Sequence, residues 1–84
     1  MYSVESEHHA LQQVAALPAE ALSYYAELMT VLEIAPWGGE AYDRQRPDGN
    51  MRTYVFGKHD QGMVIYLILE DQRRVIVLRV LWAG

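Results

Sequence analysis

The sequence predicts an α+β domain in which two helices pack on one face of an antiparallel sheet. Apolar residues recur at helical spacing across residues 8–34, and residues 51–82 form three extended runs separated by short polar turns. A further short run, YSVES, precedes the helices, so the expected element order is β-α-α-β-β-β. The chain has 84 residues, of which 51% are hydrophobic, and this size predicts a single domain spanning residues 1–84.

The N-terminal half predicts a helical hairpin. Ser6 is expected to cap the first helix, with Glu7 in the first turn facing the positive helix end. Pro18 ends this helix and suits the first turn of the second, which ends near Ile34 before Pro36 and two glycines. The apolar stripes of the two helices contain Ala10, Leu11, Val14 and Leu17, and then Ala21, Leu22, Tyr25, Leu28, Met29 and Leu32.

The C-terminal half predicts a loop followed by β structure. APWGGEAYDRQRPDGN reads as a long loop with a turn at RPDGN. MRTYVFG, GMVIYLILE and RVIVLRVLW then read as strands, and their short connections predict antiparallel hairpins. Residues 2–5 are expected to add an edge strand. We expect seven apolar side chains of the helices and the last strand to be buried between the helices and the sheet: Leu11, Val14, Leu22, Leu28, Ile76, Leu78 and Val80.

The last two strands are apolar on both faces, although the helices can cover only one. Arg79 interrupts the last strand, and an unpaired buried charge costs several kcal/mol. We therefore place Arg79 on the open face, and Ile76, Leu78 and Val80 against the helices. An exposed apolar face usually binds a partner, so we expect either a homodimer or a complex with another protein.

Charge is divided unevenly between the two halves. Residues 1–43 hold seven acidic residues and no Lys or Arg, whereas residues 44–84 hold all seven cations and four acidic residues. A basic region of this kind can bind phosphates on a protein whose net charge is −4, although small domains also divide their charge by accident. The chain has no cysteine, which excludes disulfides and zinc-thiolate sites and suits the cytoplasm. We expect no membrane segment and no secretory signal.

Several stretches resemble the RelE/ParE superfamily of bacterial toxins from type II toxin–antitoxin systems. They are LPAEA at the start of the second helix, the run GMVIYLILEDQRRVIVLRV, and VLRVLWAG, which is similar to the lRVlHg ending of ParE-like members. The resemblance implies either mRNA cleavage in the ribosomal A site without metal or cofactor, as in RelE-like members, or poisoning of DNA gyrase, as in ParE-like members. It also implies a cognate antitoxin that wraps the toxin.

The resemblance carries over to individual positions unevenly. Arg79 matches the arginine of the lRVlHg ending, and Arg52 lies on the strand where RelE-like members carry lysines or arginines. Met63 or Val64 stands where RelE-like members have another arginine. Trp82 stands where ParE-like chains have histidine.

RNA cleavage without metal needs a base for the 2′-hydroxyl, a cation for the charged phosphorane and an acid for the leaving oxygen. The candidate catalytic residues are Arg52, Arg79 and His59. The candidate RNA-binding residues are Arg44, Arg46, Lys58, Tyr54 and Trp82, since cations hold phosphates and aromatic rings stack on bases. Tyr54 or Tyr66 is a further candidate proton donor.

Four of the candidates also have a non-catalytic interpretation. His59 lies in the hairpin loop GKHDQG, where an exposed histidine without function is common. Arg52 can pair with an acidic residue of the long loop, Arg79 can bind an acidic antitoxin residue, and Trp82 can cover the core. His8 and His9 are not a metal site, because neighbouring helical residues point about 100° apart.

The leading interpretation is a toxin acting on RNA at the ribosome, with gyrase as the second target. The alternative is a protein-binding module of the same fold that has no catalytic activity.

Overall fold

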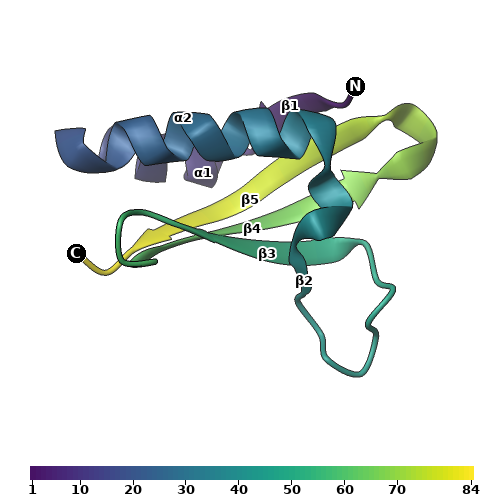
Figure 1. Cartoon of the computed structure of the whole chain (residues 1–84). Helices are drawn as coiled ribbons and strands as arrows, with labels where there is room; N and C mark the ends of the chain where they lie inside the picture. Colours follow the sequence, from purple (N-terminus) through teal and green to yellow (C-terminus); the bar gives the residue numbers. More distant parts are fainter.

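The computed structural model describes residues 1–84 and confirms the α+β class (Figure 1). Its strands form one five-stranded sheet in the order β1-β5-β4-β3-β2. The elements are β1 (Ser3–Ser6), α1 (His8–Ala15), α2 (Ala19–Ile34), the 3₁₀ helix η1 (Pro36–Gly38), β2 (Glu40–Ala41), β3 (Met51–Phe56), β4 (Gly62–Leu69), the 3₁₀ helix η2 (Glu70–Gln72) and β5 (Arg74–Trp82).

The predicted antiparallel pairing is confirmed for β3, β4 and β5. The edge strand β1 pairs with β5 in parallel, with Val4 opposite Val75, so the complete sheet is mixed. A short turn forces consecutive strands to run in opposite directions, but two helices and three strands separate β1 from β5, so β5 can return to the end where β1 starts and run parallel to it. The predicted long loop also contains structure, since β2 within it pairs with β3.

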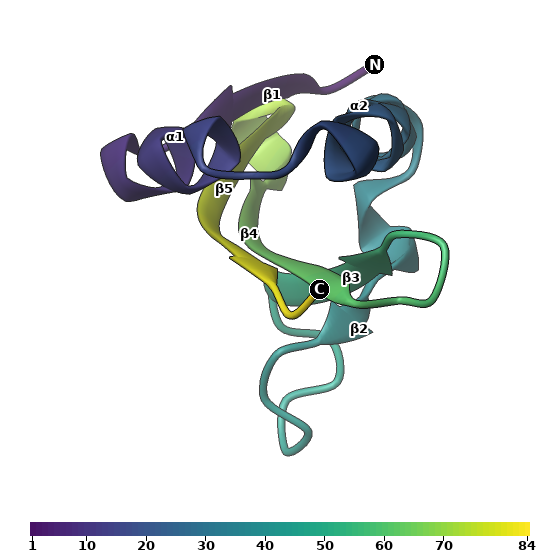
Figure 2. The same cartoon turned by 90° about the vertical axis from the view of Figure 1, so that its left-hand side faces the viewer.

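Both helices lie on the same face of the sheet, as Figure 2 shows, while the loop between β2 and β3 projects away from them (Figure 1). The core lies between these layers. From the sheet it takes Val64, Tyr66 and Ile68 of β4 and Val75 and Val77 of β5, none of which is more than 1% exposed. From the helices it takes Ala10, Ala21, Tyr25, Leu28 and Leu32.

Two predicted core residues on the helices are exposed. Leu11 and Leu22 are 55% and 44% accessible, so their predicted burial is wrong. On each helix the preceding residue, Ala10 or Ala21, is fully buried instead. Adjacent helical residues point about 100° apart, so an apolar stripe can be wider than the strip that meets the sheet. The burial of Leu28 is confirmed, and Val14 is half-buried against the core.

A β-bulge in β5 shifts the alternation of its side chains. Tyr66 pairs with Val77 and Ile65 with Arg79, which leaves Leu78 as the extra residue. Val77 therefore faces the helices before the bulge and Val80 faces them after it. Ile76, opposite Leu67, lies on the open face and Leu78 is only half-buried, so placing these two against the helices was wrong. Val80 is buried and Arg79 lies on the open face, as predicted.

The cap of α1 also differs from the prediction. Ser6 belongs to β1, where its pairing with Val77 holds it extended. Glu7 is the N-cap residue, and its carboxylate accepts a hydrogen bond from the backbone N of His9 at 3.0 Å. Pro18 occupies the N-cap position of α2, which ends at Ile34 as expected. None of the helices is both long and apolar enough to span a bilayer.

Candidate functional site

The open face of the sheet is largely apolar. We define it by the side chains that alternate with the buried ones on β3, β4 and β5: Met51, Thr53, Val55, Met63, Ile65, Leu67, Leu69, Arg74, Ile76, Arg79 and Leu81. Three of them, Met51, Val55 and Leu81, are 36%, 43% and 46% exposed. Two cations lie on this surface: Arg74, opposite Leu69, is paired with Glu5 at 2.6 Å, whereas Arg79, opposite Ile65, has only a 3.6 Å contact with Glu7.

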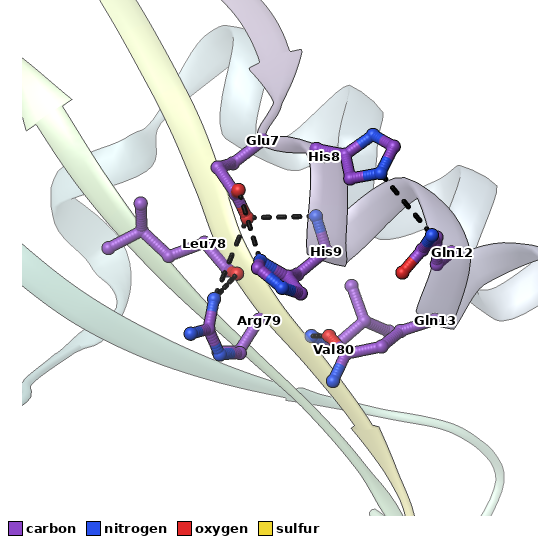
Figure 3. Close-up of polar contacts among 8 residues, drawn as sticks. All are labelled: Glu7, His8, His9, Gln12, Gln13, Leu78, Arg79 and Val80. Carbon is purple, nitrogen blue, oxygen red and sulfur yellow. Dashed lines mark hydrogen bonds and ion pairs between the residues drawn. The ribbon is translucent and has the colours of Figure 1, made fainter.

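The guanidinium of Arg79 is held from the end of β1 (Figure 3). Its Nη1 donates to the carbonyl of Leu78 at 2.7 Å and lies 3.6 Å from Oε2 of Glu7. The other carboxylate oxygen of Glu7 lies 3.3 Å from Nδ1 of His9. One carboxylate therefore contacts both a cation of β5 and a histidine of α1.

Backbone pairing brings these distant segments together. Glu7 N donates to the carbonyl of Val77 at 2.9 Å, which fixes the start of α1 beside the bulge of β5. Val80 N, just beyond the bulge, donates to Oε1 of Gln13 at 2.7 Å (Figure 3). The bulge and the junction between β1 and α1 therefore place Arg79 and Glu7 together, although they are 72 positions apart in the sequence.

The surroundings of Glu7 favour the charged form of its carboxyl group. Its partial burial acts in the opposite direction, but hydrogen bonds from the backbone and ring of His9, together with the charge of Arg79, hold its pKa below the ordinary value. The sequence predicts Glu7 only as a residue of the first helical turn, and it raises His8 and His9 only as a metal site, so neither Glu7 nor His9 is predicted beside Arg79. The available signal was a carboxylate two residues before a histidine at a helix start.

Arg52 lies on the other face of the sheet. It pairs with the fully buried Tyr66, whereas Arg79 pairs with the preceding residue of β4, Ile65, so the two arginines do not share a face. Three nitrogens of Arg52 donate to backbone carbonyls of the loop: Nε to Gly49 at 3.0 Å, Nη1 to Gly39 at 3.0 Å and Nη2 to Pro47 at 2.8 Å. Its guanidinium also lies 5.0 Å from the ring centre of Trp37. Arg52 therefore fastens the loop, through carbonyls rather than through an acidic residue.

The hairpin between β3 and β4 brings three other candidates together. Lys58, His59 and Trp82 line one pocket of about 360 Å³, which is completed by Gln61 and by Glu20, Ser23 and Tyr24 of α2. Trp82 also packs on Phe56, with ring centres 5.7 Å apart. A cation, an imidazole and an aromatic ring here can hold a phosphate and a base, but the pocket includes neither Arg52 nor Arg79.

The remaining candidates are more scattered. Arg44 and Arg46 lie exposed on the loop between β2 and β3, and Arg46 lines a second pocket of about 460 Å³ with Met51 and Leu67 of the open face. Tyr54 is half-buried against the core. Tyr66 is fully buried and donates its hydroxyl to the carbonyl of Pro36 at 2.6 Å, and burial raises its pKa to about 12. No three His, Cys, Asp or Glu side chains lie close enough together to hold a metal ion.

Comparison with known proteins gives results for structure but not for sequence. No protein-family model matches the chain, and no curated protein matches it. Among solved structures, the isolated RelE toxin of E. coli matches with a TM-score of 0.81 at 12% identity, covering 100% of this chain and 86% of that one. The chain has the RelE toxin fold.

Two toxin–antitoxin complexes contain the same RelE fold. The intact E. coli RelBE complex matches with a TM-score of 0.80 at 12% identity, covering 100% of this chain and 99% of that one. The RelBE2 complex of Mycobacterium tuberculosis matches with a TM-score of 0.75 at 21% identity, with 98% of each chain covered. The resemblance seen in the sequence is therefore confirmed at the level of the fold.

Proposed function

We propose that this chain is the toxin of a toxin–antitoxin pair. The observation that carries the proposal is the agreement with RelE toxins over the whole chain, at a TM-score of 0.81. Two of the similar structures are complexes of a toxin with its antitoxin. A cognate antitoxin is therefore the expected partner of this chain.

The antitoxin segment binds the open face. This surface combines apolar side chains with Arg79, whose only hydrogen bond within the chain is to Leu78. A segment with apolar residues and one carboxylate complements it, because burial of the apolar groups supplies affinity and the carboxylate pairs with the guanidinium. A second copy of the chain is the other occupant to test, since an apolar face also suits a homodimer.

The target of the toxin is RNA at the ribosome. The positively charged C-terminal half supports this target, as does the pocket of Lys58, His59 and Trp82, whose side chains suit a phosphate and a stacked base. Metal-independent cleavage of mRNA in the cytoplasm is the corresponding activity. DNA gyrase is the second target, as in ParE-like toxins.

One observation favours a second candidate function, a binding module without catalysis. Arg52 is occupied by three carbonyls of its own chain, and neither Arg79 nor His59 lies beside it. A centre assembled from Arg52, Arg79 and His59 is therefore not supported by their positions. Under this alternative the chain binds its partner through the same open face and does not arrest growth.

Induced expression in a bacterial host tests the proposal. We expect growth arrest with loss of intact mRNA and no induction of the DNA-damage response. Growth arrest with DNA damage and stable mRNA would indicate gyrase instead. Normal growth with soluble, folded protein would contradict the toxin proposal and leave the binding module. A Leu22→Ala variant, altered at an exposed position of α2, serves as a matched control.

A further inference from the structure

We infer that Glu7, His9 and Arg79 form a phosphodiester-cleaving centre, with His9 as proton acceptor and Arg79 as the cation that stabilises charge on the phosphorus. The inference rests on the proposed RNA target and names the residues that would act on it. Neither Arg52 nor His59 belongs to this centre. The centre lies where the end of β1, the start of α1 and the bulge of β5 meet (Figure 3).

The contact between His9 and Glu7 prepares the imidazole to accept a proton. Nδ1 of His9 lies 3.3 Å from the carboxylate, and in the tautomer that donates from Nδ1 to Glu7 the other ring nitrogen, Nε2, carries the free lone pair. The backbone N of the same histidine donates to the same carboxylate at 3.0 Å, which ties the two residues together twice. The side chain of His9 is 65% exposed, so Nε2 can reach a substrate hydroxyl. A base oriented by a carboxylate is the arrangement that activates hydroxyl nucleophiles.

Arg79 supplies the cation. Only Nη1 of its guanidinium is engaged, by the carbonyl of Leu78 at 2.7 Å and by Glu7 at 3.6 Å. Nη2 and Nε are therefore open to two non-bridging oxygens of a phosphate, which match the planar fork of arginine. Since the residue sits on a strand beside a bulge held by Gln13, the backbone that carries these donors is in place before substrate arrives.

The reaction is transfer of the phosphoryl group to the neighbouring ribose hydroxyl. Nε2 of His9 takes the proton of the 2′-hydroxyl, and the 2′-oxygen forms a bond to phosphorus while Arg79 holds the non-bridging oxygens. The bond from phosphorus to the 5′-oxygen breaks, and this oxygen takes a proton from a solvent water. The hydroxide that remains is neutralised by the proton on His9. The products are a 2′,3′-cyclic phosphate and a 5′-hydroxyl end, and the histidine returns to its starting form.

The chain provides its own control, because His8 is a second histidine on the same helix turn. The two imidazole centres lie 6.1 Å apart, but Nε2 of His8 faces the amide nitrogen of Gln12 at 3.3 Å rather than Glu7 (Figure 3). His8→Ala changes the local charge and helix propensity much as His9→Ala does. Only the second variant removes the proton acceptor.

The test uses the purified full chain with 70S ribosomes programmed with a defined mRNA, and with the same RNA free in solution. We expect His9→Ala to cleave about 100-fold more slowly than wild type or worse, as for loss of a general base. Imidazole in the buffer should restore part of that rate, since it can take the place of the missing side chain. His8→Ala should cleave at the wild-type rate, and a 2′-deoxy nucleotide at the scissile position should block cleavage.

Arg79 and Glu7 are tested in the same assay. Arg79→Ala should lose on the order of 100-fold in kcat, as for removal of a donor to a developing charge. Glu7→Gln should lower kcat by a smaller factor with unchanged KM, because glutamine keeps an oxygen for the helix cap and removes the charge that faces His9 and Arg79. A merely structural Glu7 would instead lower the melting temperature without separating kcat from KM.

Two outcomes separate this inference from the proposed function. If the wild type cleaves RNA and His9→Ala cleaves equally well, the centre is elsewhere, while the toxin proposal stands. The same conclusion holds if His8→Ala loses as much as His9→Ala, or if imidazole restores nothing. If the wild type cleaves neither substrate, both the RNA target and this inference are wrong.

Discussion

Arg52 and Arg79 stand on opposite faces of one sheet, and the chain satisfies them to very different extents. Three nitrogens of Arg52 donate to carbonyls of Gly39, Pro47 and Gly49, whereas Arg79 donates to one carbonyl and has a longer contact with Glu7. A guanidinium whose donors are taken up by its own chain holds structure, and one with free donors can bind an anion. Arg52 is therefore satisfied within the fold, whereas Arg79 keeps donors that are available to a partner or substrate.

The two faces of the sheet on which these arginines lie also differ in how far their side chains are covered by the rest of the chain. Val64, Tyr66 and Ile68 of β4 are covered by the helices and almost inaccessible. Ile65 and Leu67, which alternate with them, are half-buried on the open face. The same strand therefore carries one row of side chains that stabilises the fold and another that is available to a partner.

The largest effect on stability should come from the covered face. Ile68→Ala removes a side chain that is 1% exposed and leaves a cavity, so we expect a loss of about 2–5 kcal/mol in the free energy of unfolding. Leu67→Ala, the neighbouring residue on the open face, should cost less than about 1.5 kcal/mol. Urea denaturation of both variants measures the difference. Equal losses would mean that the open face is already covered in solution, as in a homodimer.

The next effect concerns the loop that Arg52 holds. Arg52→Ala leaves three carbonyls without their donors, and hydrogen bonds to charged groups contribute about 1.5–3 kcal/mol each before relaxation and solvent replace part of them. We expect a net loss of about 2 kcal/mol, together with faster hydrogen exchange across residues 40–50. Arg44→Ala, on the same loop, is the control and should fall within about 0.5 kcal/mol of wild type. An unchanged stability for Arg52→Ala would remove the distinction between the two arginines.

Arg73 sharpens the comparison, because its acceptor is a carboxylate that can titrate. Oε1 of Glu70 accepts hydrogen bonds from the hydroxyl of Tyr2 at 2.6 Å and from Nε1 of Trp37 at 2.7 Å, and Oε2 accepts from Nη1 of Arg73 at 3.0 Å. The bonds from Tyr2 and Trp37, followed by the contact with Arg73, hold the pKa of Glu70 below its ordinary value. This cluster joins the N-terminus, η1 and the turn before β5.

A lowered pKa in the folded state makes the contribution of Glu70 dependent on pH. The stabilisation is fully present above the pKa of an unfolded glutamate, about 4.3, and is lost as the pH falls through the lower folded value. Glu70→Gln should therefore melt several degrees below wild type at pH 7, and the difference should shrink toward pH 3. The cost of Arg52→Ala should change much less over this range, since its carbonyl acceptors do not titrate. A constant difference for Glu70→Gln would show that the charge is not what stabilises the cluster.

Much of this arrangement could be predicted from the sequence because it follows from side-chain periodicity and from turns. The two helices, the three long strands and the place of Arg79 on the open face all follow from local patterns. The bulge at Leu78 could not be predicted, since an inserted residue leaves no mark in a run as uniformly apolar as VIVLRVL. Ile76 was therefore assigned to the wrong face.

The candidate site was harder to predict because its contacts join distant parts of the chain. Glu7 meets Arg79 only because β1 pairs in parallel with β5 in a particular register. Arg52 binds backbone carbonyls, which every residue carries and no side-chain pattern reveals. Acidic partners and strand faces can be inferred from residue types, but these contacts depend on the complete fold.

Arg79→Ala should have the smallest effect on stability and is the sharpest test of the comparison. Its side chain is 48% exposed and its ion pair with Glu7 is long, so the free energy of unfolding should stay within about 0.5 kcal/mol of wild type.

Partner binding should respond far more strongly to the same change. If an antitoxin carboxylate pairs with Arg79 in a buried setting, Arg79→Ala should weaken the complex by about 2–5 kcal/mol, and Arg79→Lys should recover only part of this because lysine lacks the planar fork. If Arg79 acts in catalysis instead, Arg79→Ala should abolish toxicity while antitoxin binding survives. Isothermal titration with the antitoxin and growth assays on the same variants distinguish these roles. Full toxicity with unchanged antitoxin affinity would show that the free donors of Arg79 meet only solvent.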